Sequence, residues 1–157
     1  MKITLILNGK TEDDYLIKGI SIYEQRLKHY IPFEMIVIPA LKNAKALSIE
    51  QQKQKEAELL LKNVQPSDRL ILLDELGKEL GSVQFSEFIQ QQMNSGIKNL
   101  VFVVGGPYGF SDEVYKRANG KVSLSKMTFS HQMVRLFFIE QLYRAMTILR
   151  NEPYHHS

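Results

Sequence analysis

Runs of strand length, built almost entirely from Val, Ile and Leu, recur along this chain. Four of them occupy residues 3–7, 35–38, 70–73 and 100–104, and a weaker fifth occupies residues 121–124. The first four are nearly continuous in apolar residues rather than alternating with polar ones. Continuous runs are typical of strands covered on both faces, as in parallel sheets.

Helical patterns separate these runs. Residues 12–30 repeat apolar and aromatic side chains at spacings near 3.6, and residues 83–95 and 111–118 also read as helices. Thr11 is a candidate cap for the first helix, Ser48 for a second helix, and Gly96 for the end of the third. Alternating strands and helices predict an α/β fold, with a mostly parallel sheet and helices on both faces. With no repeat or long linker, residues 1–157 are expected to form one domain.

The final predicted helix, residues 132–150, is apolar around its whole circumference. Such a helix must be buried on more than one side. Either it is a central core helix, or one face packs on the sheet while another meets a second copy of the chain in an isologous dimer. We favour the dimer, because 157 residues leave little interior to surround a terminal helix. Glu140 and Arg144 sit at i,i+4, which is also the spacing of an ordinary helix-surface pair.

Composition removes several classes of chemistry. The chain contains no cysteine, which excludes thiolate nucleophiles, Cys-ligated zinc, iron–sulfur clusters and disulfides. No metal-ligand spacing is present, so no metal is expected. The first residues hold too short an apolar run for a signal peptide or a membrane span, so we expect a cytoplasmic protein that does not enter a membrane.

Charge is unevenly distributed. The whole chain carries +3, yet residues 1–115 hold 13 basic and 15 acidic side chains. Residues 116–157 hold seven basic side chains against two acidic ones, together with three of the four histidines. An anionic partner is therefore expected to meet the C-terminal quarter.

Three segments are candidates for chemistry. A glycine-rich turn, 105–109, follows the fourth strand and suits either a ligand or a simple strand exit. Asp74 follows the third strand and is equally compatible with a ligand contact or a solvated turn. A polar loop joins the fifth strand to the last helix, where Ser130 or Thr128 is a candidate cap. No dinucleotide fingerprint, Walker A loop or nucleophile elbow is present.

Together these segments resemble the RlmH-type (YbeA-like) members of the SPOUT methyltransferases, along essentially the whole chain. The matching motifs are Leu73-Asp74 with Gly77-Lys78, Phe102-Val103-Val104-Gly105-Gly106-Pro107-Tyr108-Gly109, Leu124-Ser125-Lys126-Met127-Thr128-Phe129-Ser130-His131, Val134-Arg135, Glu140-Gln141-Leu142-Tyr143-Arg144-Ala145 and Pro153-Tyr154-His155. Two departures are mild: Ser130 replaces a usual proline, and Asn8-Gly9 replaces a more usual Val-Gly.

The resemblance implies a deep C-terminal trefoil knot, a homodimer and S-adenosylmethionine as methyl donor. It also implies methylation of N3 of a pseudouridine in 23S ribosomal RNA. Carried over by position, the cofactor site comprises Leu73, Gly105, Leu124, Ser125, Lys126, Met127, Thr128 and Phe129. The C-terminal helix becomes the dimer surface. The chain lacks an added RNA-binding domain, so recognition is expected on the assembled ribosome.

The predicted catalytic groups are Tyr154 and His155, which would hold or deprotonate the base, and Arg144, which would stabilise developing charge from either subunit. Two alternatives stay open. One is a non-catalytic RNA- or ribosome-binding module on the same scaffold. The other is a SPOUT enzyme of different specificity, such as ribose methylation, which usually depends on an arginine early in the chain; residues 1–25 contain none.

Overall fold

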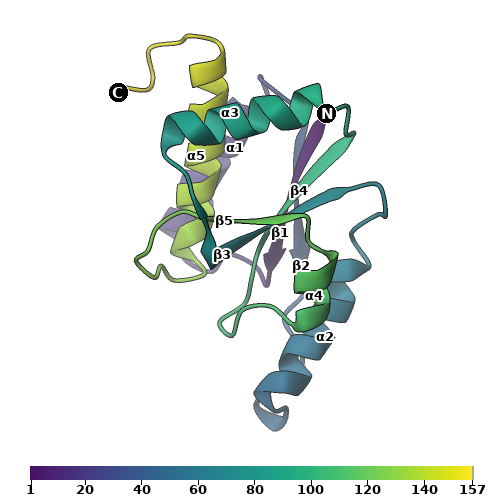
Figure 1. Ribbon diagram of the computed structural model, residues 1–157. Helices are drawn as coiled ribbons and strands as arrows, with labels where there is room; N and C mark the ends of the chain where they lie inside the picture. The colour runs from purple at the N-terminus through teal and green to yellow at the C-terminus, as the bar shows by residue number, and fades with distance from the viewer. Residues whose placement is uncertain (157) are drawn as a thin grey trace.

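The computed structural model describes residues 1–156, in which five parallel strands form one sheet (Figure 1). Their order is β2-β1-β4-β3-β5. The strands span β1 Lys2–Asn8, β2 Phe33–Ile38, β3 Arg69–Glu79, β4 Asn99–Val104 and β5 Gly120–Ser123. All five lie where the apolar runs predicted them. β3 alone continues well beyond its apolar run, into polar residues.

The helices are α1 Asp14–Leu27, α2 Ile49–Leu61, α3 Ser82–Asn94, α4 Asp112–Arg117 and α5 Met133–Leu149, with a short 3-10 turn, η1, at Ala44–Ala46. Ser48 caps α2 as predicted, because its hydroxyl accepts from Gln51 N while the Gln51 side chain accepts from Ser48 N. Gly96 has the positive φ of a residue that follows a helix end. The prediction for Thr11 was wrong: α1 starts three residues later, with Asp13 at the N-cap position.

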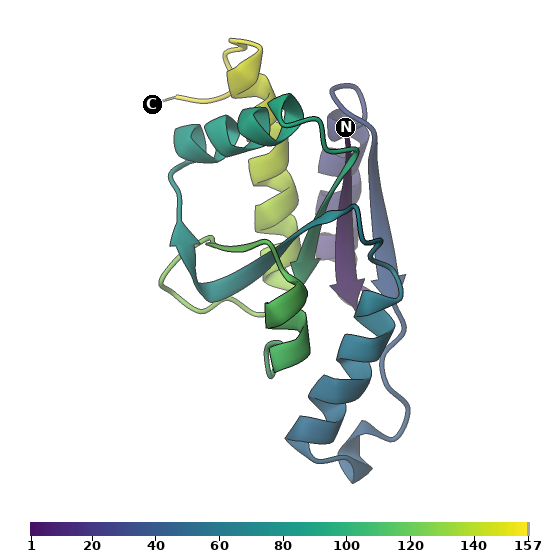
Figure 2. The same ribbon diagram turned by 45° about the vertical axis from the view of Figure 1, so that its right-hand side comes forward.

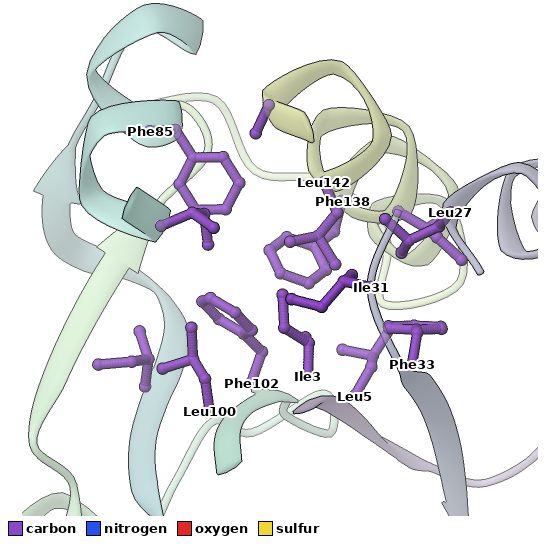
Figure 3. Close-up of a cluster of buried hydrophobic side chains, with 14 of the residues drawn as sticks. Ile3, Leu5, Leu27, Ile31, Phe33, Phe85, Leu100, Phe102, Phe138 and Leu142 are labelled. Atoms are coloured by element: carbon purple, nitrogen blue, oxygen red, sulfur yellow. The ribbon is translucent and has the colours of Figure 1, made fainter. Parts of the chain in front are cut away.

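Helices cover both faces of the sheet, as predicted. On one face, α1, α3 and α5 enclose a core in which Phe85, Phe102 and Phe138 meet (Figure 3). On the other face, α2 and α4 pack on the side chains that point the opposite way from the same strands. Leu100 and Phe102 belong to the first core, and Val101 belongs to the second. Burial on both faces explains why the strands read as continuous apolar runs.

The long strand β3 bends across β5. It pairs with β5 both before and after the bend, at Leu73 opposite Val122 and at Lys78 opposite Val122. Gly77 lies at the crossing, where a Cβ atom would come within 2.7 Å of the Val122 backbone. Only a glycine allows two backbones to approach this closely.

The carboxyl ends of β1 and β2 point toward the lower part of the molecule, whereas β3 turns upward at its end toward α3 (Figures 1 and 2). η1 and α2 extend beyond the edge of the sheet at which β1 and β2 end (Figure 2). In open α/β sheets this edge is where ligands bind. None of the helices in residues 1–156 is long and apolar enough to cross a membrane.

Candidate active site

A cleft of about 630 Å³ lies at the carboxyl ends of β3, β4 and β5. Its walls come from the turn after β4 and the loop between β5 and α5, segments that the sequence singled out separately. Seven of the eight residues predicted to bind the cofactor line this cleft: Leu73, Gly105, Leu124, Ser125, Met127, Thr128 and Phe129. The fold therefore brings together at one place residues more than fifty positions apart in the chain.

The eighth predicted residue, Lys126, is not among the residues that line the cleft. Its side chain is 87% exposed, and its ammonium lies 3.8 Å from the Glu79 carboxylate. A pair this exposed contributes little to stability. Any contact of Lys126 with a ligand in the cleft would come from its backbone, whereas its side chain is free to meet an anion from outside.

Three serine hydroxyls shape the loop between β5 and α5. Ser123 donates to the Ser125 carbonyl at 2.9 Å, and Ser125 accepts from Met127 N at 3.0 Å. Ser130 accepts from Met133 N at 3.0 Å, although the N-cap position of α5 is Gln132, which makes no side-chain cap bond. These local bonds fix the conformation of the loop and engage the Ser125 carbonyl and the Met127 N–H. Ser125 thus has a structural task besides the predicted cofactor contact.

Gly105 faces a neighbour that the sequence did not suggest. A Cβ atom at this position would lie 3.0 Å from the ring of Phe110, which follows in the same turn. Phe110 is buried and packs edge-on against Tyr115. Because Gly105 has no side chain, the Phe110 ring can pack directly against the backbone of the turn that forms this wall of the cleft.

Asp74, for which two interpretations were open, lines the cleft but is already bonded within the chain. Its carboxylate accepts from Leu76 N at 2.8 Å and from the hydroxyl of Tyr115. Burial and this bond to Asp74 raise the pKa of Tyr115 to about 12. Lys121 lies 5.3 Å from the centre of the Tyr115 ring. These contacts give the cleft a polar edge beside its apolar wall.

Arg135, which sequence reasoning left without a role, is the most deeply buried charged residue of residues 1–156, with 1% of its surface exposed. Its guanidinium donates to four acceptors: His131 O at 3.0 Å, Asn8 O at 2.8 Å, Gly9 O at 2.9 Å and Thr11 Oγ1 at 3.1 Å. Burial lowers the pKa of this guanidinium. Arg135 ties the loop after β1 to the loop that borders the cleft. The sequence signals were its position within an apolar helix and its place in the Val134-Arg135 motif, and neither indicated these contacts.

The three predicted catalytic residues form one cluster with Glu140. Arg144 donates to Glu140 Oε1 at 2.6 Å and to His155 Nδ1 at 3.0 Å, while the Tyr154 hydroxyl donates to Glu140 Oε1 at 2.9 Å. The hydrogen bond to Glu140 raises the pKa of Arg144, and burial raises the pKa of Tyr154 above its ordinary range. Tyr154 is thereby kept as a protonated donor, and because a guanidinium only donates, His155 Nδ1 accepts.

This cluster and the cleft lie at opposite ends of α5, which starts at the loop that borders the cleft and ends just before the segment that carries Tyr154 and His155. Val134, in the first turn of α5, lines the cleft, whereas none of Arg144, Tyr154 and His155 does. Ten residues of helix separate Val134 from Arg144, a rise of about 15 Å. Within one chain, the predicted cofactor residues and the predicted catalytic residues do not meet.

The cleft suits a ligand with an adenine ring and no phosphate. Leu73, Leu124 and Phe129 provide apolar walls, the loop backbone provides donors and acceptors, and no cationic side chain lines it. An apolar slot with a few convergent polar groups is the usual form of a small-ligand site. The residues present therefore fit S-adenosylmethionine.

Comparison with known proteins gives the family. Residues 1–155 match the family model described as "Predicted SPOUT methyltransferase". The chain belongs to the SPOUT methyltransferase family. This membership carries with it the trefoil knot expected from the sequence.

Relatives that match along their full length also carry the name of a methyltransferase. The chain is 65% identical over 157 residues, covering 100% of both chains, to "Ribosomal RNA large subunit methyltransferase H" of Parabacteroides distasonis. Relatives of the same name from Christiangramia forsetii and Bacteroides thetaiotaomicron are 64% and 58% identical, over 99% and 100% of both chains. These matches span the whole chain, and so include the segments that form the cleft, α5 and the C-terminal cluster.

Proposed function

We propose that this SPOUT methyltransferase uses S-adenosylmethionine to methylate N3 of a pseudouridine in 23S ribosomal RNA. The observation that carries the proposal is the cleft, which gathers seven of the eight expected cofactor residues at one edge of the sheet. The relatives' names support ribosomal RNA of the large subunit as the substrate.

The site is proposed to be completed in a homodimer through α5. Apolar side chains beside the cleft are left open to solvent: Met127 is 75% exposed, Phe129 36% and Phe137 40%. The Phe129 and Phe137 rings contact each other in a tilted arrangement, with their centroids 5.1 Å apart, which joins the loop to the outer face of α5. An isologous, antiparallel pairing along this face would bring the end of one α5 beside the start of the other. The Arg144–Tyr154–His155 cluster of each chain would then reach its partner's cleft.

In that arrangement the chain's own groups hold and polarise the base. When bound in the cleft by Leu73, Leu124 and Phe129, S-adenosylmethionine would supply a methyl group activated on its sulfonium, with the neutral thioether as the leaving group, and the N3 proton would pass to solvent. Arg144 offers a guanidinium to the negative charge that develops on the imide. His155 presents an Nε2–H donor for one base carbonyl that flanks N3, because its Nδ1 accepts from Arg144. Tyr154, whose hydroxyl donates to Glu140 in the free protein, would redirect that hydrogen to the other carbonyl when the base binds. Holding the methyl group and N3 in line accounts for much of the proposed rate enhancement.

Substrate recognition is proposed to rest on the assembled ribosome. In this proposal residues 1–157 form one domain, which acts in the cytoplasm. Lys126, exposed beside the cleft, is a candidate phosphate contact. No metal takes part in the proposed reaction.

Mass spectrometry of ribosomal RNA nucleosides tests the reaction. A strain lacking this gene is expected to lose one N3-methylated pseudouridine, and the intact gene to restore it. A gene ending at Glu152 is expected not to restore it, although its protein still binds S-adenosylmethionine by calorimetry. Retention of the modified nucleoside in the deletion strain would refute the proposed reaction, and restoration by the shortened gene would refute the role of the tail. Equal rates on protein-free RNA and on ribosomes would refute the need for the assembled particle.

A further inference from the structure

A second cavity, of about 480 Å³, adjoins the cofactor cleft. The two share Gly106, Pro107 and His131 in their walls. Its remaining walls come from the loop after β1, the end of β2, η1 and α2, the part of the molecule that extends beyond the sheet (Figure 2). Methyl transfer requires an acceptor next to the donor. This cavity is therefore placed where an acceptor nucleotide would lie.

Two carboxylates line this cavity, the exposed Glu12 and the half-buried Glu56, and Glu56 has no strong partner. Its two nearest donors are the amide groups of Asn8, at 3.5 Å, and Gln52, at 3.4 Å, both at the long limit of a hydrogen bond. A Cβ atom at Gly106 would lie 3.1 Å from Glu56 Oε2, so the carboxylate packs against the wall shared with the cleft. Burial raises the pKa of Glu56. A half-buried carboxylate with spare acceptor capacity favours a ligand that brings an N–H donor.

The surroundings of Glu56 suit a nucleotide. Val37, Pro39, Leu59 and Pro107 supply apolar surface against which a base can pack. The exposed Lys10 lines the wall itself, and two further exposed lysines, Lys42 and Lys45, belong to the segment whose Leu41 and Ala44 form another wall. The lysines would attract the phosphates of a nucleotide to the outside of the cavity, and the Glu56 carboxylate would accept a hydrogen bond from the neutral base inside it.

We propose that this second cavity receives the flipped-out target base and that Glu56 reads the N1–H group of pseudouridine. The inference rests on the proposed function and adds to it the residue that distinguishes pseudouridine from uridine. Pseudouridine is joined to ribose through carbon and therefore keeps an N1–H donor, where uridine offers only a C–H group. Glu56 accepts that hydrogen, and the amides of Asn8 and Gln52 are placed to donate to the adjacent C2 carbonyl. N3, on the far side of that carbonyl, then faces the shared wall and the methyl donor.

The hydrogen bond between Glu56 and N1–H is expected to discriminate strongly between pseudouridine and uridine. A site built to pair with a donor is left with an unpaired buried acceptor when the analogue lacks it. Uridine in the cavity would leave Glu56 desolvated and unpaired. Removing the carboxylate should therefore slow the reaction with pseudouridine and leave the reaction with uridine unchanged or faster.

The test compares two ribosome preparations, one with pseudouridine at the target position and one with uridine, from cells that lack the pseudouridine-forming enzyme. The ratio of kcat/KM for the two substrates is measured for the unchanged protein, Glu56→Met and Glu56→Gln. The ratio is expected to fall about 10- to 100-fold in Glu56→Met, and by less in Glu56→Gln, which keeps one acceptor oxygen. Because both rates come from the same enzyme preparation, partial loss of folded protein does not alter the ratio.

Glu58→Met is the matched control, because Glu58 is an exposed carboxylate on the same helix and does not line the cavity. Its ratio is expected to equal that of the unchanged protein. An unchanged ratio in whichever Glu56 variants fold, or an equal loss with both substrates, would overturn the inference while leaving the proposed function intact. If the unchanged protein methylates neither preparation, the proposed function itself fails, and the inference falls with it.

Discussion

Arg135 is the residue whose replacement should reveal most about how the active site is held. Arg135→Met keeps most of the aliphatic stem but removes a guanidinium that satisfies the carbonyls of Asn8, Gly9 and His131. Hydrogen bonds to a charged group contribute about 1.5–3 kcal/mol each, and the cost of burying the guanidinium offsets part of their sum. Removing one partner from such a buried network costs about 3–5 kcal/mol, which we expect for this variant.

Equilibrium unfolding in urea measures this loss. With an m-value of about 2–3 kcal/mol/M, the midpoint should fall by about 1–2 M. All variants are compared at one protomer concentration, because the stability of a dimer depends on concentration. Arg135→Lys retains the charge but reaches fewer of the acceptors, so its loss should be intermediate.

Arg150→Met provides the control, since Arg150 is exposed and rests on the Tyr30 ring at 4.5 Å. It should lose less than about 1 kcal/mol. A loss of similar size in Arg135→Met would refute the reasoning, because it would mean that the loops after β1 and before α5 do not need this arginine. The same variant should also bind S-adenosylmethionine more weakly, since His131 borders the cleft.

Three further predictions follow from close contacts and titrating groups. Gly77→Ala should lower the free energy of unfolding by about 3 kcal/mol or more, because the added Cβ would lie 2.7 Å from the Val122 backbone. Gly81→Ala, whose Cβ would lie 3.7 Å from a flexible side chain, should lower it by less than about 1 kcal/mol in the same urea titration. Equal losses in the two variants would contradict the close approach of β3 and β5 at Gly77. Gly105→Ala should weaken S-adenosylmethionine binding at least about tenfold by calorimetry, because the Phe110 ring, 3.0 Å from the added Cβ, must move. Adding Phe110→Leu to the same chain should restore part of the affinity. An affinity equal to that of the unchanged protein would contradict the assignment of this cleft as the S-adenosylmethionine site. Tyr30 and Tyr115 have pKa values raised to about 12, by the hydrogen bond to Glu152 and by burial respectively. The stability that these phenols contribute should be complete below their ordinary pKa near 10 and lost as pH rises from about 10 to about 12. The loss of stability over this range should be smaller in Tyr30→Phe and Tyr115→Phe. Identical curves of stability against pH for these variants and the unchanged protein would refute the raised pKa values.

Much of the fold was predictable because the strands are buried on both faces. A strand such as β4, covered by α5 on one side and α4 on the other, cannot carry polar residues, and its sequence shows this directly. The polar end of β3 was not predictable, because its residues are exposed and its pairing depends on β5, more than forty positions later. The strand order had no local signal either.

The site was predictable in parts but not in its assembly. The motifs around Gly105 and Leu124 marked the cleft, because loops that follow strands of one parallel sheet meet at the same edge. The direction of Lys126 and the buried contacts of Arg135 depend on where distant backbone atoms lie, which spacing along the chain does not encode. The same limit hid the separation between the cleft and the cluster of Arg144, Tyr154 and His155.

That separation leads to the central claim, that each active site combines the cleft of one chain with the C-terminal cluster of the other. The decisive measurement is the activity of a purified heterodimer, made by co-expressing two differently tagged chains. One chain carries Gly105→Val, which blocks its cleft, and the other ends at Glu152, which removes Tyr154 and His155. Neither parent homodimer should methylate ribosomes. The account predicts that the heterodimer, with one complete site, has about half the turnover of the unchanged dimer. A heterodimer as inactive as its parents would contradict the account.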